Sequence, residues 1–126
     1  MKILVVDNDE GSRRLLCDLL KTKGVECIEA ETGSKELVVN LSSEIKCCVT
    51  DIMMPEMNGY ELAKQIREKY PEIYIIATTA SLSKMDMIKL TEMDLFDDVL
   101  LKPIELKNFD KVFNIFIEEC AKGDIE

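Results

Sequence analysis

The sequence predicts an α/β protein with a doubly wound, five-stranded parallel sheet and helices on both faces. Five short apolar runs alternate with segments of helical periodicity along the 126 residues, which is typical of this fold class. Most of the runs are continuously apolar, as expected for parallel strands that helices cover on both sides. The length suits one packed core, so we expect a single domain over residues 1–126.

The expected strands are the apolar runs, at residues 3–6, 25–28, 47–49, 73–77 and 99–101. The expected helices lie at about residues 11–23, after the N-cap Thr32, from the N-cap Asn58 to Pro71, at about 85–93, and at 106–120. Glycine suits the left-handed end of a helix, so Gly24 and Gly123 are expected to end the first and last of these.

The charge balance argues against several classes of partner. The chain has 16 Lys and Arg against 25 Asp and Glu, a formal net charge of −9 that repels nucleic acid and anionic lipid. No uncharged stretch approaches the roughly 18 residues of a membrane span, and the N-terminus does not resemble a signal peptide. We therefore expect a cytoplasmic protein without direct nucleic-acid or membrane binding.

Histidine is absent, and five cysteines form no C-x-x-C pair. The lack of histidine excludes Ser-His-Asp triads, Cys-His dyads, imidazole metal ligands and a phosphohistidine of the chain's own. The cysteines lie in apolar stretches, so we expect buried free thiols. Chemistry must then rest on aspartate, lysine and hydroxyl groups.

Polar side chains gather where the expected strands end. In parallel sheets, ligands bind beyond the carboxyl ends of the strands, so these residues should converge on one edge. The set comprises Asp7, Asn8 and Asp9 after the first run, Asp51 after the third, Thr78 and Thr79 after the fourth, and Lys102 before Pro103. Oxygen ligands of this kind suit Mg²⁺, which keeps several waters.

This residue set indicates phosphoryl transfer to a carboxylate. Lys102 can balance the carboxylates and then meet a phosphoryl oxygen. No glycine-rich phosphate loop is present, so a bound nucleotide is not expected. The chemistry that remains is a carboxylate nucleophile that accepts a phosphoryl group with the help of a metal.

The chain resembles a response-regulator receiver domain over nearly its whole length. The most specific motif is DIMMPEMNG at residues 51–59, a strand-end aspartate followed by the family's M-P-x-M-[DN]-G loop. The resemblance implies the strand order 2-1-3-4-5. It also implies these roles: Asp51 as the phosphorylated residue, Asp7 as an acidic residue of a Mg²⁺ site, Met53 as its carbonyl ligand, Thr79 as the switch hydroxyl and Lys102 as the lysine of the K-P pair.

Three positions depart from the family pattern. Asn8 stands where receivers usually carry the second acid of the metal site, although an offset alignment would give that place to Asp9. Val99 replaces the aromatic switch residue three positions before the lysine, and residues 95–96 replace a Gly-Ala pair. Because valine is short and β-branched, we expect activation to move residues 81–87 while Val99 keeps one rotamer.

The resemblance implies a single-domain, chemotaxis-type or relay-type regulator with no output domain. A sensor histidine kinase or histidine phosphotransfer protein would phosphorylate Asp51, and the changed surface would bind a downstream target protein. The alternative is a receiver-like interaction module that works without phosphorylation, which Asn8 and Val99 favour. A flavodoxin-like electron carrier has little support, since aromatic residues make up 6% of the chain and tryptophan is absent.

Overall fold

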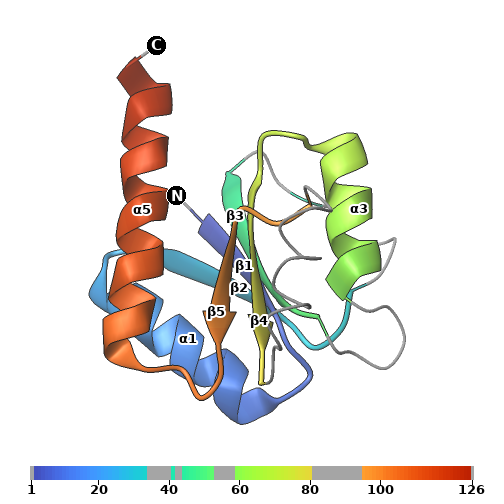
Figure 1. Cartoon of the computed structure of the whole chain (residues 1–126), viewed down its shortest axis with the longest axis vertical. Helices are drawn as coiled ribbons and strands as arrows, with labels where there is room; N and C mark the ends of the chain where they lie inside the picture. Colours follow the sequence, from blue (N-terminus) through green and yellow to red (C-terminus); the bar gives the residue numbers. More distant parts are fainter. Residues whose placement is uncertain (1, 34–40, 42–43, 53–58, 81–94, 126) are drawn as a thin grey trace.

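A computed structural model describes residues 2–33, 41, 44–52, 59–80 and 95–125 of the chain (Figure 1). Its strands are β1 (Lys2–Val6), β2 (Glu26–Ala30), β3 (Ile45–Asp51), β4 (Tyr74–Thr79) and β5 (Asp98–Leu101). Its helices are α1 (Glu10–Thr22), α3 (Gly59–Lys69) and α5 (Leu106–Ile125).

The five strands form one parallel sheet in the order β2-β1-β3-β4-β5. This confirms the predicted fold class and the strand order that the resemblance implies. β1 lies between β2 and β3, so Val5 is opposite both Glu29 and Val49. All five strands therefore present their carboxyl ends at the same edge of the sheet.

Helices cover both faces of the sheet: α1 and α5 pack on one face and α3 on the other (Figure 1). Side chains along a strand alternate between faces, so Ile3 and Val5 of β1 join the core under α1 and α5, whereas Leu4 joins the core under α3. The larger core contains the three buried phenylalanines of α5, which are Phe109, Phe113 and Phe116. These two cores fix the positions of the strand ends that carry the polar residues.

The expected element boundaries can now be compared with the structure. Gly24 has a φ of 75° just after α1, as predicted for a helix end. The expectation that Gly123 ends the last helix is wrong, because α5 continues to Ile125. Glycine in a helix costs only about 1 kcal/mol, so it does not by itself stop one. The helices expected after Thr32 and at about 85–93 involve residues that the structure does not describe.

The cysteine expectation is confirmed in part. None of the five cysteines is in a disulfide, and Cys17, Cys47 and Cys48 are buried, but Cys27 and Cys120 are only half-buried. Burial raises the pKa of Cys48 to about 12. In the described ranges, no helix has both the length and the apolar character needed to cross a membrane.

Candidate functional site

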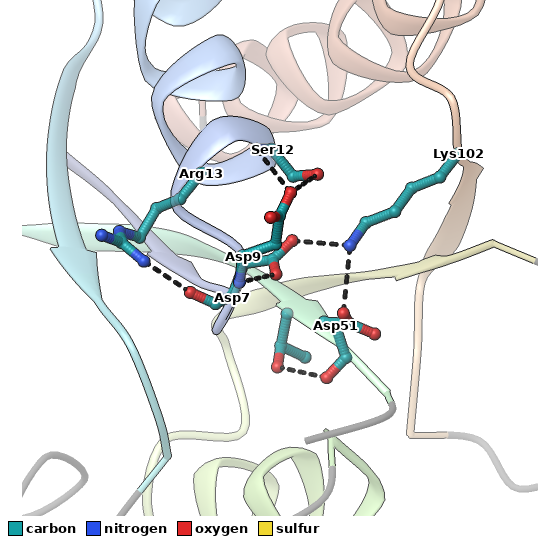
Figure 2. A network of polar contacts seen from close by, with 7 residues as sticks. Asp7, Asp9, Ser12, Arg13, Asp51 and Lys102 are labelled. Atoms are coloured by element: carbon teal, nitrogen blue, oxygen red, sulfur yellow. Dashed lines mark hydrogen bonds and ion pairs between the residues drawn. The ribbon is translucent and has the colours of Figure 1, made fainter. Parts of the chain in front are cut away.

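Two carboxylates and one ammonium group meet at the carboxyl edge of the sheet (Figure 2). Asp7 follows β1, Asp51 ends β3 and Lys102 follows β5. Lys102 Nζ lies 2.8 Å from Asp7 Oδ2 and donates a hydrogen bond to Asp51 Oδ2 at 3.0 Å. The two aspartates are nearly buried, with exposed fractions of 1% and 7%. The group carries one negative charge in excess in a place with little access to water.

Backbone hydrogen bonds between neighbouring strands continue beyond the last apolar residues, and they position these side chains. The N–H of Lys102 donates to the carbonyl of Thr79 at 2.8 Å, and the N–H of Asp7 donates to the carbonyl of Ala30 at 3.1 Å. Asp51 lies opposite Thr78 in the register of β3 and β4. The sheet therefore places the three charged residues side by side before any ligand binds.

The charge state of Lys102 follows from this arrangement. Burial by itself lowers the pKa of the ammonium group, but the contacts with Asp7 and Asp51 outweigh burial and raise the pKa above its ordinary value of 10.5. Lys102 is therefore protonated at neutral pH and balances one of the two carboxylates.

Asp7 offers a carboxylate oxygen that suits a metal. Asp7 Oδ1 accepts a hydrogen bond from the N–H of Asp9 at 2.9 Å, whereas the buried Oδ2 forms an ion pair with the ammonium of Lys102 at 2.8 Å and has no other polar partner among the described residues. No group of three or more acidic or thiol side chains that fits a metal occurs in the same part of the chain. Two carboxylates with waters nevertheless fit Mg²⁺, because this ion keeps several waters in proteins.

Asn8 and Asp9 have different surroundings. Asp9 is the N-cap of α1: its Oδ2 accepts hydrogen bonds from the N–H of Ser12 at 3.0 Å and from the Ser12 hydroxyl at 2.7 Å. These hydrogen bonds lower the pKa of Asp9. The cap thus uses one oxygen of Asp9, while Asn8 is exposed beside it. Met53 lies in the part of the loop that the structure does not describe.

The two threonines of β4 and Val99 flank the charged group. Thr79 is the last residue of β4 and is 3% exposed. The hydroxyl of its neighbour Thr78 is buried and has no hydrogen-bond partner among the residues described. Val99 is half-buried and packs against Ile52 and Ala77, which lie next to the strand ends. Residues 81–87, which we expect to move on activation, lie within the undescribed range 81–94.

Gly59 of the sequence motif is required by a close approach of two backbones. Its N–H donates to the carbonyl of Ile52 at 3.2 Å at the start of α3. A Cβ atom at this position would lie 2.5 Å from the carbonyl oxygen of Asp51 and 2.6 Å from the Cα of Ile52. Only glycine lets α3 begin directly against the end of the strand that carries Asp51.

Sequence reasoning missed one charged residue that contacts this site. Arg13 of α1 is 8% exposed and donates a hydrogen bond to the main-chain carbonyl of Asp7 at 2.8 Å (Figure 2). The sequence did contain a signal: Arg13 lies three residues before Leu16 and four before Cys17, so a charged residue occupies the apolar stripe of α1. Such a residue needs polar partners inside the fold.

The chain is similar to known proteins in sequence. A family profile described as the response regulator receiver domain matches residues 3–114. "Sensor histidine kinase RcsC" of Escherichia coli (strain K12) is 32% identical over 123 residues, which cover 98% of this chain and 13% of that protein. "Transcriptional regulatory protein RprY" of Bacteroides fragilis is 31% identical over 107 residues, which cover 85% of this chain and 45% of that protein. The chain therefore spans less than half the length of either relative.

Solved structures share the fold. A CheY-like response regulator receiver domain protein from Methanospirillum hungatei superposes with a TM-score of 0.83 at 22% identity, over 97% of both chains. At this identity the likeness concerns the fold, and it agrees with the strand order found here.

Proposed function

The chain belongs to the response-regulator receiver family of two-component signalling, and from this premise we propose that Asp51 accepts a phosphoryl group from a phosphohistidine donor. The observation that carries the proposal is the contact of Lys102 with both Asp51 and Asp7 at the carboxyl edge of the sheet. A receiver of this kind is a phosphoacceptor switch, in which the chain is modified and then demodified, and not a turnover enzyme.

In the proposed transfer, a carboxylate oxygen of Asp51 attacks phosphorus. A P–O bond forms as the P–N bond to the donor imidazole breaks, and the electron pair of that bond stays on the imidazole nitrogen. Catalysis of such transfers is mostly positioning and neutralisation of charge. Lys102, protonated and already beside Asp51, stabilises the added negative charge, and the hydroxyl of Thr79 donates to a phosphoryl oxygen once the group is in place.

The proposed metal ligands are the carboxylates of Asp7 and Asp51, the side chain of Asn8 and the main-chain carbonyl of Met53. The buried Oδ2 of Asp7, whose polar contact among the described residues is the Lys102 ammonium alone, supports this assignment. When bound, Mg²⁺ would supply positive charge to the phosphoryl oxygens. Lys102 supplies a positive charge to the same carboxylates from the protein itself.

The proposed donor is a sensor histidine kinase or a histidine phosphotransfer protein, and the proposed reader is a target protein that binds the changed surface. Two of the similar proteins carry the names sensor histidine kinase and transcriptional regulatory protein, which supports a place in such a signalling chain. We place the protein in the cytoplasm, where histidine kinases phosphorylate their regulators.

The test is incubation with acetyl phosphate and Mg²⁺ followed by intact-mass spectrometry. The protein should gain the mass of one phosphoryl group, and Asp51→Asn should abolish that gain. Asp18→Asn, which removes an exposed carboxylate of α1, serves as the matched control and should gain as much as the parent. An equal gain in Asp51→Asn would overturn the assignment.

A second candidate function is an interaction module that works without phosphorylation. The exposed Asn8 favours it, because an amide replaces the acid that receivers usually carry at that position and weakens attraction for a cation. This function predicts that the wild-type protein gains no phosphoryl mass from acetyl phosphate at saturating Mg²⁺. A gain in wild type that Asp51→Asn loses rejects it.

A further inference from the structure

Arg13 is a buried cation behind the carboxylate site. Its side chain is 9% exposed, although it stands in the first turns of α1 on the face that packs against the sheet. A buried guanidinium is costly unless its N–H groups find acceptors. Its partners in the described part of the chain are the carbonyl of Asp7 just after β1, Glu29 of β2 and Glu31 just after β2, so the buried cation is directed at the ends of these two strands.

The guanidinium joins three elements of the fold. One terminal nitrogen donates to the carbonyl of Asp7 at 2.8 Å, and Nε donates to Glu29 of β2 at 3.1 Å. The other terminal nitrogen lies 4.0 Å from the carboxylate of Glu31. Glu29 therefore supplies the counter-charge, and the planar fork of the guanidinium is free to aim a second donor at Asp7.

With this contact, three of the four polar groups of Asp7 have a hydrogen-bond partner, and the fourth is in an ion pair. Its N–H donates to the carbonyl of Ala30, its carbonyl accepts from Arg13, and its Oδ1 accepts from the N–H of Asp9. The remaining oxygen, Oδ2, faces Lys102 at 2.8 Å. The first two contacts fix the main chain of Asp7, and the Asp9 N–H fixes Oδ1, so that Oδ2 is directed toward the ammonium group and Asp51.

We propose that Arg13 is a positioning residue that aims the carboxylate of Asp7 into the phosphoacceptor site, with Glu29 fixing Arg13 in turn. The inference rests on the proposed function for its biological purpose, but the orientation of Asp7 can be measured without phosphorylation. Arg13 touches neither a phosphoryl group nor a metal in this arrangement. It acts through Asp7, in the way that outer partners of metal ligands orient those ligands.

A matched control exists in the same chain. Arg67 of α3 also donates to main-chain carbonyls, to Ile73 at 2.7 Å and to Leu95 at 3.2 Å, but these lie away from the strand ends that carry Asp7 and Asp51. A purely structural role for Arg13 predicts that losing either arginine has the same consequences. The positioning role predicts that only Arg13 affects Asp7.

The experiment compares the wild type with Arg13→Gln, Arg13→Lys, Glu29→Gln and Arg67→Gln. NMR of labelled protein without metal reports the carboxyl carbon of Asp7 and the amide of Asp9, which donates to it. Calorimetric titration with Mg²⁺ alone and urea denaturation complete the comparison. Arg13→Gln should shift both NMR signals and weaken Mg²⁺ binding about tenfold. Arg13→Lys and Glu29→Gln should do the same to a smaller extent.

Arg67→Gln should lower stability at least as much while leaving the Asp7 and Asp9 signals in place and Mg²⁺ affinity within about twofold of wild type. Unmoved Asp7 and Asp9 signals in a folded Arg13→Gln would overturn the proposal, as would equal shifts in Arg67→Gln. If Arg13→Gln does not fold, Glu29→Gln decides by the same signals. A wild type that takes no phosphoryl group refutes the proposed function alone, because the metal-free NMR signals still decide the role of Arg13.

Discussion

Two arginines fasten helices to the sheet, one on each face, and their networks end differently. On the α3 face, Arg67 pairs with Asp97, and Asp97 Oδ2 also accepts from the N–H of Ile75 at 2.8 Å. Arg67 also donates to the carbonyls of Ile73 and Leu95, and in the described part of the chain neither Arg67 nor Asp97 has a buried polar side-chain atom without a hydrogen-bond partner. On the α1 face, the network that begins at Arg13 ends on Asp7, whose buried Oδ2 meets only an ammonium group among the described residues.

The difference separates a structural polar network from a functional one. We call a network closed when each buried acceptor in it has a donor, as around Arg67, and open when one acceptor is left for a ligand, as at Asp7. A closed network mainly stabilises the fold, because its buried acceptors are satisfied. An open network keeps an acceptor and an excess negative charge in place, which stabilises the fold less and is the arrangement that the proposed Mg²⁺ site requires. The two arginines therefore predict different responses to substitution.

The largest expected effect concerns the closed network. Arg67→Met should lower the free energy of unfolding by about 3 kcal/mol, because it removes the donor of several main-chain carbonyls and the ion-pair partner of Asp97. Arg14→Met is the control: Arg14 forms an exposed pair with Glu10, and its loss should cost under about 0.5 kcal/mol. Urea denaturation at pH 7 measures both. Similar values for the two variants would contradict the closed network.

An intermediate effect, on Mg²⁺ affinity, is expected from a substitution at Asn8. Asn8→Asp should tighten Mg²⁺ binding about tenfold, or roughly 1.4 kcal/mol, because it adds a negative charge to a site that already has one in excess. The measurement is calorimetric titration with Mg²⁺. A matched variant, Asn114→Asp, adds the same charge at an exposed position of α5 that is farther along the helix from Lys102, and should leave the affinity within about twofold. Equal or weaker binding in Asn8→Asp would make Asp9 the next residue to test.

The smallest expected effect is a pH dependence that belongs to Lys102. Its pKa is raised in the folded protein, so its stabilising contribution is complete below pH 10.5 and is lost as pH rises through the folded value. The free energy of unfolding of wild type should exceed that of Lys102→Met by on the order of 1 kcal/mol at pH 9, and the gap should shrink at pH 11. Urea titrations of both proteins measure it. If the difference in the free energy of unfolding between wild type and Lys102→Met does not change with pH, the charge of Lys102 is not the cause of that difference.

Much of the fold could be predicted from local patterns, and the misses have a physical cause. The apolar runs located all five strands, but β3 extends from Ile45 to Asp51 where the sequence indicated residues 47–49. Thr50 and Asp51 continue the hydrogen-bonded ladder next to Ala77 and Thr78. A hydropathy pattern stops at the first polar residue, whereas backbone pairing does not depend on the side chain.

The same reasoning explains what was found and missed in the site. The sequence was enough to predict that Asp7, Asp51 and Lys102 lie close together. Each of them directly follows or ends a strand, and the carboxyl ends of parallel strands lie at the same edge of the sheet. Arg13 and Arg67 lie within helices, and their partners are main-chain carbonyls on other elements. Contacts of this kind depend on how a helix packs, which the order of residues does not specify.

The absence of room for a Cβ at Gly59 has a mechanical consequence. The first turn of α3 and the end of β3 touch through bare backbone, with the carbonyl of Asp51 filling the space that a side chain would take. A shift of the Asp51 main chain would therefore act directly on the backbone of Gly59, and we expect the first turn of α3 to move with it.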